Sequence, residues 1–276
     1  MKRRWPLFCS TGAIAGEPYQ TAYRSIIHYG PMLEVDGLEI MFFRAWYPEV
    51  EHVAAKLLAS GLRFPIIHAE KSIGPSLGSP LAEERAQGLE RLAINCRFGA
   101  QLGARLLVLH LWGLPDSDEH LERNLGMLDA CLALAASAGL ELAVETIPCV
   151  RADPLSNVYR AIEQDRRCLV ALDTEFLTFH QQLEESLATD WLWQDGRVRH
   201  VHIKDYDGQM FGPNNFRRYL HPGEGSIDFS SFFKGLAAQG FHGSITLEAS
   251  GVQQDGTIDM ARVQTSLAFL HGLLKP

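Results

Sequence analysis

The segment Asp116–Ile147, DSDEHLERNLGMLDACLALAASAGLELAVETI, contains the unit that decides the fold. Its first part carries apolar residues every three or four positions, as at Leu121 and Leu125, and this spacing predicts an amphipathic helix. Gly139 marks the end of that helix, because glycine commonly occupies the position just past the last turn. Leu140–Ile147 then alternates between two faces, as a strand does.

The same helix-and-strand unit recurs along the whole chain. Eight apolar runs are predicted as strands, and their starts lie roughly 34 residues apart on average, which is the size of one strand-plus-helix crossover. The predicted strands are Leu7–Thr11, Gly37–Phe43, Phe64–Glu70, Arg105–Trp112, Leu140–Ile147, Leu169–Thr174, Val198–Lys204 and Ser244–Glu248. The clearest predicted helices are Pro48–Ser60, Leu81–Leu102, Asp116–Ala138, Phe229–Gln239 and Asp259–Leu274. Because no strand-to-helix turn carries a GxGxxG fingerprint, we expect an α/β fold with a single (β/α)8 TIM barrel over residues 1–276.

Composition narrows the classes of protein to consider. The chain has 276 residues, of which 46% are hydrophobic and 21% charged, so it can build a large core. Its net charge of −8 disfavours binding to nucleic acid or to an anionic membrane surface. No run approaches the roughly 18 apolar residues that span a bilayer. We therefore expect neither nucleic acid nor membrane as a partner.

The cysteines and the start of the chain indicate the compartment. The five cysteines form no CxxC pair, which is typical of buried, reduced thiols. The basic start Met1–Arg4 is followed by Pro6 and Gly12, which interrupt the apolar run that an export signal needs. The expected location is the cytoplasm.

Two connections after predicted strands are longer than the others. Lys71–Pro80 follows the third strand, and Asp205–Gly225 follows the seventh. Active-site loops of barrel enzymes leave the carboxyl ends of the strands, so both connections are candidate lids.

Charged residues end the last four strands on the side that faces the barrel. Alternation places Glu145, Asp173, His202 and Glu248 there, while His200 lies deeper and is expected to be a hydrogen-bonded core histidine. Buried carboxylates are costly without a cation, and a divalent metal would supply the missing charge. Three carboxylates and one imidazole suit one Mn, Mg or Co ion, with zinc as an alternative.

Other polar and aromatic residues near the same strand ends are candidate substrate contacts. His68 and His110 end the third and fourth strands, Trp112 and Lys204 lie at strand exits, and Arg217 lies in the seventh connection. The alternatives are backbone hydrogen bonds or a second metal for the histidines, core packing for Trp112, and a solvated charge for Arg217.

Five runs carry a resemblance to a known superfamily. They are Leu142–Pro148 (LAVETIP), Leu172–Thr174 (LDT), Val201–Asp205 (VHIKD), His221–Phe229 (HPGEGSIDF) and Gly243–Glu248 (GSITLE). In order and spacing they resemble the xylose-isomerase-like TIM-barrel superfamily. That superfamily includes sugar phosphate isomerases and epimerases, hydroxypyruvate isomerase, inosose dehydratase, dehydroshikimate dehydratase and the family 2 type of apurinic endonucleases.

The resemblance implies roles for the four strand-end residues. Glu145, Asp173, His202 and Glu248 match the metal ligands of the superfamily, and the two glutamates match its acid and base. The implied function is a divalent-metal-dependent isomerase or epimerase of a small sugar, keto sugar or related polyol, in carbohydrate metabolism. It would transfer a proton through a metal-stabilised enediolate. Manganese fits such a site, and a homo-oligomer is compatible with the resemblance.

Three alternatives stay open. A metal-dependent lyase or dehydratase of a keto polyol or keto acid would use the same enolate and expel a hydroxyl group. An apurinic endonuclease is disfavoured by the net charge, and a non-catalytic sugar-binding barrel would have no reason to keep all four ligands. Many superfamily members carry a histidine three residues after Asp173, where this chain has Phe176, and His180 could replace it only if the loop turns back.

Overall fold

The eight predicted strands form a closed parallel barrel in the computed structural model, which describes residues 4–275. Each strand pairs with the next one along the chain, and β8 pairs with β1. The strands are β1 (Leu7–Ser10), β2 (Gly37–Met41), β3 (Ile66–His68), β4 (Leu106–Leu109), β5 (Glu141–Glu145), β6 (Leu169–Asp173), β7 (Val198–Ile203) and β8 (Ser244–Leu247). The predicted (β/α)8 fold is confirmed. Met1 to Arg3, on which the expectation about export partly rests, lie outside the described residues.

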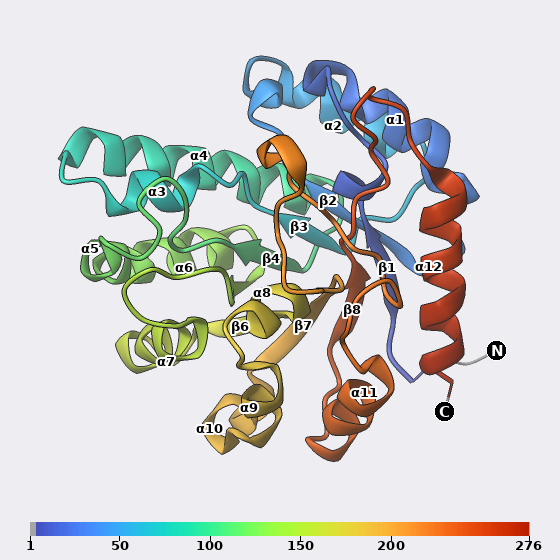
Figure 1. Ribbon diagram of the computed structural model, residues 1–276. Helices are drawn as coiled ribbons and strands as arrows, with labels where there is room; N and C mark the ends of the chain where they lie inside the picture. Colours follow the sequence, from blue (N-terminus) through green and yellow to red (C-terminus); the bar gives the residue numbers. More distant parts are fainter. Residues whose placement is uncertain (1–3, 276) are drawn as a thin grey trace.

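Helices surround the barrel (Figure 1). They are α1 (Ala22–Tyr29), α2 (Val50–Ala59), α3 (Ile73–Gly78), α4 (Ala82–Gln101), α5 (Leu121–Gly126), α6 (Leu128–Ser137), α7 (Pro154–Gln164), α8 (Thr174–Phe179), α9 (Leu183–Ala188), α10 (Asp190–Trp193), α11 (Phe229–Ala238) and α12 (Met260–Leu273). Gly139 ends the helical segment before β5 with a φ of 75°, a conformation that glycine adopts readily. The last helix, red in Figure 1, brings the chain ends together, since the Arg4 N–H donates to the Leu274 carbonyl at 2.9 Å.

The predicted helix over Asp116–Ala138 is two helices, α5 and α6, preceded by a turn. The turn is held by Asp118, which is buried and accepts hydrogen bonds from the backbone N–H groups of residues 150–152 at 2.7–2.9 Å. These bonds tie the turn to the loop after β5. Helical periodicity therefore identified the helix but not its start, because the anchoring partner lies more than 30 residues away.

The two candidate lids differ in structure. Lys71–Pro80 contains helix α3, which packs closely on the chain after β4: a Cβ at Gly74 would lie 2.3 Å from the His110 carbonyl oxygen. Asp205–Gly225 instead consists of isolated bridges and a short 3-10 helix. Its two ends are joined by the Asp205 carboxylate, which accepts from the N–H groups of Gly223 and Gly225 at 2.9 Å. The longer connection is therefore the less regular one.

The inside of the barrel changes from apolar to polar along the strands. Its apolar layer consists of Phe8, Ile66, Leu106, Val108, Ala143 and Ala171, all nearly or fully buried. Polar side chains fill the interior towards the carboxyl ends of the strands, among them Glu39, His68, His200 and Thr246. The larger core lies between the strands and the helices. This arrangement places charged groups where the connections leave the barrel.

All five cysteines are buried free thiols, as expected. Within residues 4–275, the helices lack the combination of length and apolarity that crossing a membrane requires.

Candidate active site

The inward-facing residues that end strands β5 to β8 come together in one cluster. Glu145, Asp173, His202 and Glu248 each offer a ligand atom, and these atoms lie within 4.8 Å of one another. The β6–β7 register pairs Asp173 directly with His202. Glu248 has 7% of its surface exposed, whereas the other three are fully buried. The convergence that alternation predicts is therefore present, and Glu248 is its outermost member.

Three imidazole rings surround the Glu145 carboxylate. His202 Nδ1 lies 2.9 Å from Oε1, while His68 Nε2 and His110 Nε2 lie 3.1 and 2.8 Å from Oε2. Burial alone would raise the pKa of Glu145, but the His202 and His110 rings hold this pKa well below its usual value. Glu145 is thus ionised, and with His68 and His110 it forms a second set of donors close enough to hold an ion.

Lys204 supplies a positive charge inside the cluster. Its Nζ lies 2.6 Å from Asp173 Oδ2, contacts Glu248 Oε2, and lies 3.9 Å from Glu175 Oε2. Burial would lower the pKa of Lys204, but Asp173 and Glu248 raise it well above the usual value. The ammonium group also lies 4.4 Å from the centre of the Phe176 ring, a cation–π contact. Phe176 therefore covers the lysine, three residues after Asp173.

The pKa values of the two acids beside Lys204 move in opposite directions. Burial raises the pKa of Asp173 to about 7, against the attraction of Lys204. Burial would also raise the pKa of Glu248, but Lys204 and His202 lower it to about 2. The carboxylate of Glu248, which is the more exposed, therefore stays ionised. The protein alone does not fully offset the cost of burying a negative charge on Asp173.

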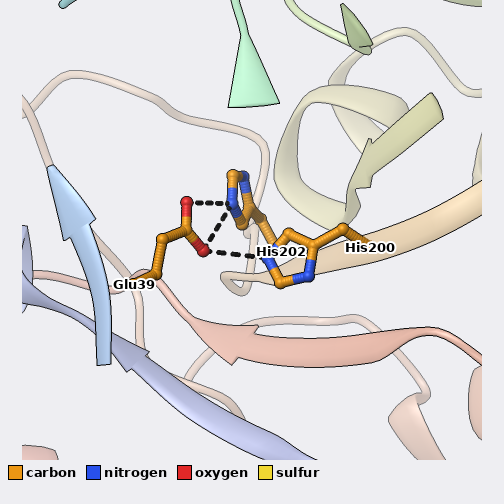
Figure 2. Close-up of side chains that lie close together, drawn as sticks. All are labelled: Glu39, His200 and His202. Carbon is orange, nitrogen blue, oxygen red and sulfur yellow. Dashed lines mark hydrogen bonds and ion pairs between the residues drawn. The ribbon is translucent and has the colours of Figure 1, made fainter. Parts of the chain in front are cut away.

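Two buried acids near the cluster were not predicted from the sequence. Glu39, in β2, faces His200 and His202 across the barrel (Figure 2). Glu175, at the start of α8, forms an ion pair with Arg217 at 2.5 Å. Alternation in β2 was the available signal for Glu39, which is the only charged residue in an apolar run. His200 is hydrogen-bonded in the interior, as predicted.

The predicted substrate contacts lie at different depths. His68 and Lys204 are buried in the cluster, and the side chain of His110 is 12% exposed. Trp112 is fully buried and donates its Nε1–H to the Pro148 carbonyl at 3.3 Å. Arg217 lines a cavity next to Glu248, although its guanidinium is already paired with an acid.

His180 does not take the place of the missing histidine. Its Nε2 accepts a hydrogen bond from the Cys149 N–H at 3.1 Å, in the loop after β5. Burial lowers the pKa of His180, so the ring stays neutral and accepts this bond. The residue therefore has a structural partner outside the four-residue cluster.

A cavity of about 670 Å³ opens above Glu248. Lys71 lines it, together with the aromatic residues Tyr19, Phe43, Phe216 and Tyr219. The rings of Tyr19 and Phe43 stack with centroids 5.0 Å apart and planes 17° apart. The cavity therefore combines the Glu248 carboxylate with aromatic side chains, a lining suited to a polar molecule that has an apolar face.

The donor set fits a divalent cation. The Asp173 Oδ2 atom is buried and makes no hydrogen bond with any residue that the structure describes, and its close contact is the ion pair with Lys204. Lys204 is shared by the carboxylates of Asp173 and Glu248, while Glu175 is paired with Arg217. Such an excess of buried negative charge is stabilised by a cation, and oxygen donors with one imidazole match the preferences of Mn, Mg or Co.

Comparisons with known proteins agree with this architecture. The family model described as xylose isomerase-like TIM barrel matches residues 32–271. None of the curated protein sequences compared with the chain matches it significantly. Many solved structures are similar to the chain, and the three described next are similar over nearly the full length of both chains.

The first of these structures is the D-allulose 3-epimerase from Methylomonas sp. in complex with D-allulose, with a TM-score of 0.73, 18% identity and 98% of each chain covered. The 3-keto-D-glucoside 4-epimerase of E. coli has a TM-score of 0.68 and 19% identity, over 97% of this chain and 99% of that one. The D-psicose 3-epimerase of Clostridium cellulolyticum H10, with D-tagatose, has a TM-score of 0.70 and 16% identity, over 98% and 100%. At these identities the likeness shows the fold alone.

Proposed function

Because the chain belongs to the xylose isomerase-like TIM barrel family, we propose that it is a divalent-metal-dependent sugar isomerase or epimerase. It moves a proton on a carbon atom next to the carbonyl group of a small sugar, keto sugar or related keto polyol. The convergence of Glu145, Asp173, His202 and Glu248 beneath an aromatic-walled cavity is the observation that carries this proposal. The three similar structures described above are sugar epimerases by name, which supports a sugar as substrate.

The four converging residues would hold one metal ion, with Mn, Mg or Co preferred and zinc as an alternative. When bound, such an ion polarises a carbonyl group and makes the neighbouring C–H group more acidic. Lys204 keeps its place beside Asp173 and Glu248 and offsets part of the remaining negative charge.

Glu248 and Glu145 are the proposed acid and base. Glu248 lies at the cavity floor, so its carboxylate can take a proton from a substrate carbon. Glu145 is fully buried, and its Oε2 contacts His110, whose side chain is partly exposed. The His110 ring therefore offers a route by which a proton can reach or leave Glu145.

The cavity walls account for binding of a sugar. The stacked rings of Tyr19 and Phe43 offer an aromatic surface to the apolar face of a sugar ring. Lys71, whose side chain is half exposed, lies 4.0 Å from Glu248 Oε1 and can donate hydrogen bonds to hydroxyl groups. Trp112 is fully buried and is not among the residues that line this cavity.

Proton exchange with solvent tests the proposal. Ketohexoses, including D-allulose and D-tagatose, and a 3-keto-D-glucoside are incubated in D2O with Mn2+ and the protein, and deuterium at carbon is followed by NMR. We expect Glu145→Gln and Glu248→Gln each to slow exchange by at least about a hundredfold, because each removes a general acid or base. Glu224→Gln is the matched control: Glu224 lies outside the cluster, pairs with Arg262 at 2.5 Å, and should leave the exchange rate unchanged.

Two results would contradict the proposal. Exchange at the wild-type rate in both active-site variants would remove the roles assigned to Glu145 and Glu248. Loss of water from the substrate, seen as a mass change and an ultraviolet chromophore, would instead favour the lyase alternative.

A further inference from the structure

His202 is held between two carboxylates on opposite sides of its ring. Its Nδ1 faces the four-residue cluster, 2.9 Å from Glu145 Oε1 and 3.7 Å from Glu248 Oε2. Its Nε2 faces the other way and lies 2.9 and 3.1 Å from the two oxygens of Glu39. His202, Glu39 and Glu145 are all fully buried, so water does not compete for these contacts.

Glu39 decides which nitrogen of His202 keeps its hydrogen when a metal ion binds. An ionised carboxylate only accepts hydrogen bonds, so the Nε2 atom that faces it must be the donor. Nδ1 faces the ionised Glu145 carboxylate in the same way, so the metal-free ring carries a hydrogen on each nitrogen. A metal ion held among Glu145, Asp173 and Glu248 would take the place of the hydrogen on Nδ1, while Glu39 keeps the hydrogen on Nε2.

A second histidine fixes Glu39 in this position. His200 Nε2 lies 2.8 Å from Glu39 Oε2, and its Nδ1 lies 2.8 Å from the Ser244 hydroxyl. The hydroxyl can donate to Nδ1, which leaves the Nε2–H of His200 to donate to Glu39. Figure 2 shows the carboxylate reaching from β2 towards both rings on β7. Glu39 thus accepts from two donors and has little freedom to turn away.

We propose that Glu39 is a positioning residue that presents His202 to the metal ion through Nδ1. This inference rests on the proposed function, since it assigns a supporting residue to the same metal site. The negative charge of Glu39 also makes the ring a better ligand, and loss of such a supporting partner typically weakens metal binding by roughly 10–100-fold.

A different role for the same residues has to be distinguished. Glu39, His200 and His202 lie close enough together to hold an ion of their own. The three contacts of 2.8–3.1 Å are, however, hydrogen-bond distances, and two N–H donors already satisfy the carboxylate. We therefore favour a hydrogen-bonded support over a second metal site.

Calorimetric titration with Mn2+ tests the inference on the full-length protein. We expect one ion per chain for the wild type and an affinity about 10–100-fold lower for Glu39→Gln. Glu224→Gln is the matched control, because it is the same substitution at a glutamate that pairs with Arg262 outside the cluster, and its affinity should stay within about threefold. Thermal melting without metal shows whether each variant is folded.

The outcomes separate this inference from the proposed function. Equal Mn2+ affinity for the wild type and Glu39→Gln overturns the role of Glu39 and leaves the metal site intact. Two ions per chain, one of them lost in Glu39→Gln, overturns it in favour of a second site. A wild type that binds no Mn2+ overturns the proposed metal dependence itself, and the positioning role with it.

A measurement on the wild type covers the case in which Glu39→Gln does not fold. In protein carrying 15N-labelled histidine and loaded with Zn2+, we expect His202 to keep its hydrogen on Nε2 and to bind the metal through Nδ1. Metal bound to Nε2, with the hydrogen on Nδ1, would overturn the inference.

Discussion

Removing the buried ammonium of Lys204 should expose how strongly the acidic cluster depends on positive charge. In Lys204→Met the side chain keeps much of its length but loses the charge that contacts Asp173, Glu175 and Glu248. Lys204 is 3% exposed, so the carboxylates would remain buried without their partner. We expect the metal-free variant to be clearly less stable than the wild type.

The size of the loss follows from the burial of the pair. Removing one partner of a buried ion pair typically costs about 3–5 kcal/mol, because the other charge is left without compensation. For a chain of this size, about 1 kcal/mol shifts the melting temperature by roughly 2–4 °C, so the expected fall is roughly 6–20 °C. Saturating Mn2+ should recover most of this loss, since the ion would supply the missing positive charge.

Calorimetric melting of the wild type, Lys204→Met and Lys71→Met, each with and without Mn2+, measures the effect. Lys71 is the control: it lies 4.0 Å from Glu248 but its side chain is 49% exposed, so its loss should cost at most about 1 kcal/mol. The reasoning is refuted if Lys204→Met melts within about 2 °C of the wild type without metal. An equal loss in Lys71→Met would refute it as well.

Three further predictions concern the surroundings of the site. Asp118→Asn should lower stability by about 2–3 kcal/mol in urea unfolding at pH 7, because a charged acceptor for the N–H groups of residues 150–152 is lost. These N–H groups lower the wild-type Asp118 pKa to about 2 although burial opposes this, so the difference in stability should be present above about pH 4 and fade towards pH 2. Gly74→Ala should lower the melting temperature by several degrees, since its Cβ would lie 2.3 Å from the His110 carbonyl oxygen, and an unchanged melting curve would contradict this close packing. Tyr19→Ala should raise KM for the sugar about 2–10-fold with kcat nearly unchanged, and a fall in kcat alone in steady-state assays would contradict a binding role.

The strands and their inward faces could be predicted because alternation is a local property. In β7, the order of Val201, His202 and Ile203 already separates the helix-facing side from the interior. Closure of the barrel then brings the ends of neighbouring strands together, which is why Asp173 and His202 could be placed side by side before the structure was known.

The partners of the inward residues could not be predicted in the same way. Glu39 contacts His202 across the barrel, 163 positions away in the sequence, and this contact depends on the tilt and stagger of the strands. The same holds for the pair of Glu175 and Arg217, which joins α8 to the long seventh connection. Alternation alone places Glu39 inside, but only the closed barrel shows what it faces.

The sequence also failed to predict the structure of two connecting segments. Residues 73–78 contain one proline and two glycines, which favour a loop, yet they form α3 because Gly74 and Gly78 permit close packing. Tertiary contacts thus override local preference there, as they do at Asp118, where a distant loop replaces the expected first turns of a helix.

Anomalous X-ray scattering from crystals grown with Mn2+ tests the central claim most directly. We predict a single strong peak bonded to Glu145, Asp173, Glu248 and the Nδ1 atom of His202. A map without a peak among these four residues would contradict the claim that they form a metal site. This holds whether manganese is found elsewhere in the crystal or not at all.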